Sequence, residues 1–246
     1  MLILFSLVLA RVSGLFAVAP IFSRGPLPTR FKLLLGVAIT LALMPGIDVD
    51  TVPGEATLVA GVLFGEFAVG LAIGLLVRLL VVSFQLAGAV MAFQMGFALA
   101  NSFDPDTGQS SPVISTIHVS MVTLLFLVIE GHHFLLRAIA ASFESFPIGA
   151  ATDWSLLTNA LLASASEMYL NAAKVAAPVA GLLLLTNAMV GFINRVAPQL
   201  SIFNIGFPMT VFGGLLAVLA ALPGTARFFL DSYFLLETRL IDLLQG

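Results

Sequence analysis

Charged side chains are so scarce in this sequence that most of the folded chain cannot be exposed to water. Only 9% of its 246 residues are Asp, Glu, Lys or Arg, whereas 60% are hydrophobic. A soluble globular domain contains about 25% charged residues, because these side chains cover its surface. We therefore predict that the surface faces lipid or other proteins and that the chain is an all-α, polytopic membrane helical bundle.

Apolar segments of the length needed to cross a bilayer recur along the sequence. A spanning helix needs about 20 mostly apolar residues. A C-terminal amphipathic helix is predicted at 225–245, after about six apolar segments at 1–22, 31–46, 57–100, 113–130, 155–193 and 202–222. Residues 57–100 would form a helix of about 65 Å, twice the bilayer core, so we predict long kinked helices or helical hairpins there and at 155–193.

Proline and glycine residues divide these segments. Turns are predicted at Pro45-Gly46, at Asp104-Pro105 and at Pro223-Gly224, because proline fixes φ and glycine relaxes it. Pro178 lies inside an apolar segment and predicts a kink. No fixed-period repeat or low-complexity linker interrupts the chain, so residues 1–246 are predicted to form a single membrane-embedded domain.

Several kinds of chemistry have no support in the sequence. Cysteine is absent, which excludes disulfides and Cys-ligated metal sites. The net charge of −3 provides no basic face for nucleic acid, and no nucleophile or phosphate-binding motif is present. Glu130-Gly131-His132-His133 has the carboxylate-imidazole spacing of some metal sites, but too few further ligands exist, so we interpret it as a helix end with interfacial polar residues. We predict no enzyme activity and no cofactor.

Ionisable and amide side chains inside apolar segments are candidate functional residues. In a membrane segment an unpaired charge costs at least about 2.5 to 3.5 kcal/mol, so each of them needs a partner or water. Glu66 and Arg78 are too far apart on one helix to pair, so each is expected to pair with another chain or a distant segment. The set predicted to be buried consists of Glu66, Arg78, Glu167, Asn171 and Lys174.

A polar stripe is predicted on the segment 155–193. Glu167, Asn171, Lys174 and Pro178 follow one another at spacings of 4, 3 and 4, which places them on one helix face. That face either lines an aqueous path or hydrogen-bonds neighbouring helices. The spacing alone does not distinguish the two interpretations.

Two pairs of glycines predict close helix packing in the segment 57–100. Gly61 and Gly65 form one pair and Gly70 and Gly74 the other, each at the four-residue spacing that lets helix backbones approach. The first glycines of the two pairs are nine residues apart, which is half a helical rotation. One helix is therefore predicted to pack against neighbours on two opposite sides.

A run in the last third of the sequence carries a specific resemblance. Residues 177–208 read APVAGLLLLTNAMVGFINRVAPQLSIFNIGFP, and this stretch resembles the signature of the FliR/SctT family of type III export-gate proteins. The resemblance identifies a packing motif at Asn194, Arg195, Pro198, Gln199, Phe203, Gly206, Phe207 and Pro208. It extends over nearly the whole chain through further agreement at Arg11, Glu66, Gln94-Met95-Gly96, Phe103-Asp104-Pro105 and Gly131-His132-His133.

The resemblance implies a transport function rather than catalysis. It implies a subunit of the flagellar type III protein export gate that contributes to the protein-conducting pore and its plug. The implied partners are FliP-like and FliQ-like subunits in a helical ring, an FlhB-like subunit, unfolded export substrates and membrane lipid, with no nucleic acid. The implied location is the bacterial inner membrane at the flagellar basal body. The Gly206-Phe207-Pro208 and Gly131-His132-His133 runs favour the flagellar branch over the injectisome branch.

The resemblance also assigns roles around one loop. In this family the matching loop, residues 101–112, plugs the closed pore, and the turn before it is pore-proximal. Proline, aspartate and glycine in the loop oppose helix formation, which suits backbone in an aqueous lumen. An ordinary exposed turn is the alternative. The loop residues are Asn101, Phe103, Asp104, Pro105, Asp106, Gly108 and Pro112, and the pore-proximal residues are Gln94, Met95 and Gly96.

Three other functions are weighed against this one. An injectisome export-gate subunit belongs to the same family. A secondary transporter is consistent with interrupted helices and buried charges, although no two halves of the sequence correspond. An intramembrane hydrolase would use Glu130 with His132 or His133 at a metal.

Overall fold

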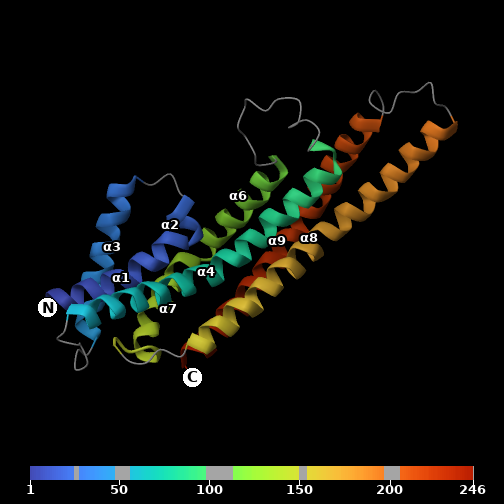
Figure 1. Ribbon diagram of the computed structural model, residues 1–246. Coiled ribbons are helices and arrows are strands. Elements are labelled where there is room, and N and C mark those ends of the chain that lie inside the picture. The colour runs from blue at the N-terminus through green and yellow to red at the C-terminus, as the bar shows by residue number, and fades with distance from the viewer. Residues whose placement is uncertain (25–27, 48–55, 98–112, 150–153, 197–205, 246) are drawn as a thin grey trace. The chain divides into compact units, whose positions relative to one another are not determined.

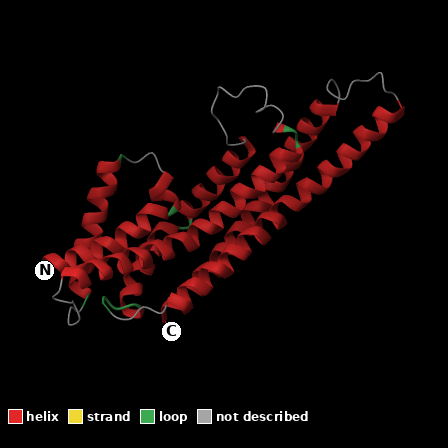
Figure 2. Ribbon diagram, viewed as in Figure 1, coloured by secondary structure: helices red, strands yellow, loops and turns green. Residues whose placement is uncertain are grey.

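The computed structural model describes six stretches of the chain, and every regular element in them is a helix (Figures 1 and 2). The described stretches are 1–24, 28–47, 56–97, 113–149, 154–196 and 206–245. Their elements are α1 (Leu2–Val18), α2 (Pro20–Arg24), α3 (Thr29–Leu43), η1 (Met44–Gly46), α4 (Ala56–Gln94), α6 (Val113–Val128), α7 (Gly131–Ser145), α8 (Trp154–Val196) and α9 (Phe207–Gln245). The predicted all-α class is confirmed.

Length and composition allow several of these helices to cross a membrane. Four qualify by themselves, and α6 with α7 makes a fifth if the bent pair is one span, with an angle of 67° between the two helices. The four are Thr29–Gly46, Val59–Gln94, Trp154–Val196 and Phe207–Leu244. The polytopic membrane bundle predicted from the shortage of charge is therefore confirmed.

Three helices continue through positions where the sequence pattern indicates a hairpin, a kink or a turn. The hairpin considered for 57–100 is wrong, because α4 is one helix of 39 residues, and α8 likewise continues for 43 residues through Pro178. The turn predicted at Pro223-Gly224 is also wrong, because both residues lie inside α9. Inside lipid, ending a helix leaves several backbone groups unsatisfied, whereas proline removes one donor, so continuing the helix costs less.

The chain is broken where the backbone leaves the helical region. The predicted helix 1–22 divides at Ala19, whose ψ of 134° is extended, so α2 begins at Pro20. Glu130 has a φ of 58° and separates α6 from α7. The helix end predicted at Glu130-Gly131 is therefore confirmed, although α7 itself was not among the predicted apolar segments.

The chain separates into two compact units, each with its own packing. Unit 1 comprises Met1–Leu80, Phe126–Ser166 and Ser232–Gly246. Unit 2 comprises Val81–Leu125 and Glu167–Asp231. The core of unit 1 includes Leu4, Leu7, Val8, Val12, Phe143 and Ile148. In unit 2 the Phe84 ring packs edge-on against Phe229, with 5.3 Å between ring centroids.

Helices α1 and α4 approach so closely in unit 1 that glycine is needed on both. A side chain at Gly14 would overlap the backbone of Phe67, and one at Gly70 would overlap the backbone of Arg11. At Gly74 an added Cβ would lie 3.0 Å from the Leu15 carbonyl oxygen. The close packing predicted for the second glycine pair is confirmed.

The first glycine pair behaves differently. A Cβ added at Gly65 would make an ordinary contact, 3.8 Å from the Trp154 ring, and one at Gly61 would meet no described atom within 4 Å. The close packing predicted on both sides of α4 is therefore absent at this pair within the described part of the chain.

A matched pair of substitutions tests this packing. We expect Gly70→Ala to lower the free energy of unfolding by about 1 to 3 kcal/mol, because the obstructing atoms are backbone and cannot repack. Gly61→Ala should be neutral or stabilising by up to about 1 kcal/mol, because alanine favours helix and the site is open. Thermal unfolding in detergent, followed by far-UV circular dichroism, measures both; equal melting temperatures for the two variants would contradict the packing.

Candidate functional site

The most buried charged group in the described part of the chain is the Arg11 guanidinium, which joins α1, α4 and α7 in unit 1. The side chain is 1% exposed, and its Nε donates to Glu66 Oε2 at 2.6 Å. Its Nη2 lies 2.5 Å from the same carboxylate oxygen, so the two side chains form a close ion pair. The guanidinium also lies 4.0 Å from the centroid of the Phe143 ring, which adds a cation–π contact.

The rest of the guanidinium is satisfied by the end of α7. Nη1 donates to the Ser142 carbonyl at 2.7 Å and to Ser142 Oγ at 3.1 Å, and Nη2 donates to the Phe146 carbonyl at 2.8 Å. The C-terminal end of a helix carries partial negative charge, so a cation is favoured there. The Ser142 carbonyl accepts from the Phe146 N–H at 2.9 Å as well as from Arg11. Arg11 therefore contacts the end of α7 as well as the first third of α4.

This cluster answers the prediction about Glu66 and includes Arg11, which was not predicted to be part of a site. Glu66 was expected to pair with a distant segment or another chain, and its partner lies 55 positions earlier in the same chain, so the first alternative is confirmed. The signal available for Arg11 was a single cation inside an apolar segment, which requires an internal anion or water.

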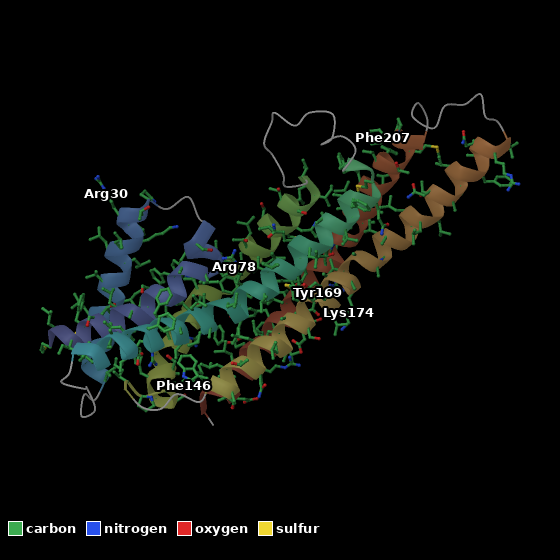
Figure 3. All side chains as sticks on the ribbon, viewed as in Figure 1. Arg30, Arg78, Phe146, Tyr169, Lys174 and Phe207 are labelled. Carbon is green, nitrogen blue, oxygen red and sulfur yellow. The ribbon has the colours of Figure 1, made fainter. Side chains whose placement is uncertain are left out.

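A second arrangement in unit 2 brings together two predicted sets of residues. The helix α4 ends in a turn at Met95 and Gly96, and Gly96 has a φ of 86°, a conformation that favours glycine. A methyl group added at Gly96 would lie 3.4 Å from the ring of Phe207, the first residue of α9 (Figure 3). Residues of the pore-proximal turn and of the packing motif thus meet.

The side chain of Met95 packs this turn against Gly214 of α9. Met95 is fully buried, and a Cβ added at Gly214 would lie 2.7 Å from its side chain. The neighbouring Gln94 keeps a buried Oε1 without a hydrogen-bond partner in the described part of the chain. The start of α9 and the end of α4 are therefore held together just before residue 98, where the described stretch ends.

The remaining candidates are distributed over other surfaces. Arg78, Glu167 and Asn171 are partly buried, whereas Lys174 is exposed, so the prediction that Lys174 is buried is wrong for the chain by itself. It projects from α8, with its ammonium 5.9 Å from the centroid of the Phe228 ring (Figure 3). An exposed position relieves the lysine of the desolvation cost that burial would impose.

Part of the predicted site lies outside the described residues. This holds for the whole loop 101–112, and for Pro198, Gln199 and Phe203 of the packing motif. The described members of the motif end α8 or begin α9: Asn194, Arg195, Gly206, Phe207 and Pro208. Among them Gly206 is buried and Arg195 is exposed.

The acidic and histidine cluster at the bend of α6 and α7 is exposed. Glu130 Oε2 lies 3.3 Å from His133 Nδ1, and both side chains are more than half exposed. Within the described part of the chain, no three His, Cys, Asp or Glu side chains are grouped to hold a metal ion. Here the two residues form a helix-end contact.

Comparisons with known proteins cover almost the full length of the chain. The family model for bacterial export proteins, family 1, matches residues 2–235. The flagellar biosynthetic protein FliR of Escherichia coli K12 is 34% identical over 220 residues, which is 89% of this chain and 84% of the relative. FliR of Bacillus subtilis 168 is 32% identical over 218 residues, which is 84% of this chain and 81% of the relative.

Removal of the buried cation tests the Arg11 cluster. We expect Arg11→Met to lower the free energy of unfolding by about 3 to 5 kcal/mol, because it leaves the Glu66 carboxylate buried without a counter-ion. Arg11→Met combined with Glu66→Leu should recover part of this loss but not all, since the carbonyls of Ser142 and Phe146 still lose their hydrogen bonds from the guanidinium.

Detergent-solubilised protein unfolded with sodium dodecyl sulfate gives these stabilities by circular dichroism. The matched control is Arg227→Met, which removes an exposed arginine and should change the stability little. A double variant no more stable than Arg11→Met alone, or a control as damaged as Arg11→Met, would rule out the ion pair as the cause.

Proposed function

We propose, since the chain belongs to the bacterial export proteins, family 1, that it is a subunit of the flagellar type III protein export gate and contributes to the protein-conducting pore and its plug. Its FliR relatives and its family make it a component of the flagellar export apparatus, and its apolar helices place it in the inner membrane. The pore, the plug and the position in the basal body belong to the proposal. The role is one of conduction and packing, without catalysis.

The observation that carries the proposal is the fixed turn at the end of α4. A loop that plugs a pore must begin at a rigid part of the fold, so that the surrounding helices determine its position. Gly96 turns the backbone out of α4, and Met95 and Phe207 fix that turn against α9. The described stretch that precedes the loop 101–112 in the sequence is therefore anchored on two helices.

The polar stripe on α8 supports an aqueous path or a protein contact beside it. Lys174 is 20 residues from the start of α8 at Trp154 and 22 from its end at Val196. A lysine at the middle of so apolar a helix is strongly disfavoured against hydrocarbon, so water or another polypeptide must face it. The same applies to Asn171 one turn earlier.

Partner subunits are proposed to cover the outer faces of α8 and α9. Only 17% of the apolar window of each helix is buried within the chain. Four glycines on these helices have no described heavy atom within 4 Å of where a side chain would begin, and they leave room for close helix approach: Gly181, Gly191, Gly213 and Gly224. FliP-like and FliQ-like subunits in a ring, with an FlhB-like subunit, are the proposed occupants, and unfolded proteins are the substrates.

The alternative functions receive less support. The relatives compared above are flagellar proteins, which favours a flagellar system over an injectisome. A secondary transporter would place its charged residues around one central solute site, whereas Glu66 is committed to Arg11. The Glu130 and His133 pair is exposed at a helix end, which is a poor environment for a hydrolytic metal.

Deletion of the loop tests the plug. We expect the chain to co-purify with FliP-like and FliQ-like subunits as a ring, and deletion of residues 104–110 to keep the ring while making bilayers that contain it conduct ions. Deletion of the seven residues 48–54 is the size-matched control and should leave the bilayers sealed. A sealed ring after the first deletion would count against the plug, and a chain isolated only as a monomer would count against the gate.

The absence of cysteine allows the stripe to be mapped by single cysteines. In the ring opened by that deletion, we expect Lys174→Cys to react with a water-soluble maleimide, because the stripe faces the aqueous path. Leu184→Cys, at a position that is 62% exposed on another flank of α8, is the control and should remain unlabelled. Protection of both cysteines would show instead that the stripe contacts a neighbouring helix.

A further inference from the structure

One face of α3 combines a terminal arginine with a row of exposed aliphatic side chains. Arg30, Leu34, Val37 and Leu41 follow at spacings of 4, 3 and 4, which places them on one line along the helix. All four are exposed. The buried residues of the helix, Gly36 and Thr40, lie off this row.

The arginine at the head of this row has no protein counter-ion in the described residues. The first turn of α3 contains no acidic residue, and none of the ion pairs in the described part of the chain involves Arg30. A cation in the first turn is also opposed by the helix dipole, so the helix gains nothing from it. Figure 3 shows the Arg30 side chain at the start of α3, where it points outward from that helix.

We propose that this face of α3 is a binding surface for one anionic phospholipid, with the phosphate on Arg30 and an acyl chain along Leu34, Val37 and Leu41. A guanidinium binds a phosphate through two parallel hydrogen bonds. In a zwitterionic headgroup the positive amine offsets part of the phosphate charge, so an anionic headgroup should bind more tightly. From Arg30 to Leu41 the helix rises by about 16 Å, close to the half-thickness of the hydrocarbon core. The row therefore has the length of one leaflet, with the cation at the headgroup end and the aliphatic side chains along the acyl chain.

The size of the side chains in the row favours lipid over a protein helix as the occupant. Only 11% of the apolar window of α3 is buried within the chain. The aliphatic part of the row consists of the bulky side chains Leu34, Val37 and Leu41, whereas helices that meet other helices in membranes present small residues at the contact. The small residues of α3 lie off this row: Gly36 is on the inward side, where a Cβ would be 4.0 Å from Phe16, and the exposed Ala38 and Ala42 are on the flank beside the row.

Competition between two lipids tests the surface. The full chain in detergent is mixed with equal amounts of phosphatidylglycerol and phosphatidylcholine of identical acyl chains, and bound lipids are counted by native mass spectrometry. We expect the chain to retain phosphatidylglycerol preferentially, and Arg30→Ala to reduce that preference about fivefold, which is the contribution of one cation near a membrane surface. Arg227→Ala, at another exposed arginine, should leave the preference unchanged.

Two further arms separate the parts of the proposal. Leu34→Asn should weaken retention of both lipids without changing their ratio, because it interrupts the acyl row and keeps the cation. Glycerol 3-phosphate at the lipid concentration should fail to displace phosphatidylglycerol, since it lacks an acyl chain. The proposal is overturned by equal retention of both lipids, by Arg30→Ala and Arg227→Ala behaving alike, by an unaffected Leu34→Asn variant, or by displacement with the soluble phosphate.

Discussion

Unit 1 depends on the saturation of a single buried guanidinium. An arginine inside apolar helices is tolerated only where its charge and its five N–H groups all find acceptors. Arg11 meets this condition with a carboxylate from α4 and with carbonyls at the end of α7. The same residue contributes its backbone to the contact with Gly70, so charge pairing and close packing are set at one level of α1. Displacing α1 would disrupt both interactions together.

The sequence predicts that a residue requires a counter-ion or a close contact better than it predicts which residue provides it. Glu66 required a counter-ion because of its apolar surroundings, and this could be stated in advance. That Arg11 supplies it could not, since the two are 55 positions apart and periodicity describes one helix at a time. Gly70 illustrates the same limit. Its spacing to Gly74 indicated close packing, whereas the equal spacing of Gly61 and Gly65 gave the same signal without it.

Helix ends were harder to predict than helices, and the reason is the solvent. In water, Pro223-Gly224 ends a helix because freed backbone groups can bind water, but in an apolar environment continuation through the proline leaves fewer groups unsatisfied. The ends that do occur have local causes: Gly96 adopts a positive φ, and Glu130 does so beside Gly131, whose packing against the Phe126 ring admits no larger side chain. At both of these helix ends the glycine, Gly96 or Gly131, also packs against an aromatic ring.

The proposal that partner subunits cover α8 and α9 depends on the polar and small residues of these exposed helices rather than on their apolar area. In lipid, an exposed leucine costs nothing, so the extent of apolar surface does not by itself distinguish lipid from protein. Polar and small residues do distinguish them, because a lysine is disfavoured against hydrocarbon and a glycine allows backbones to approach. On α8 these are Lys174 and the open Gly181, two turns apart. On α3 the exposed row is bulky and headed by Arg30. These residues are the reason why we propose protein subunits as the neighbours of α8 and lipid as the neighbour of α3.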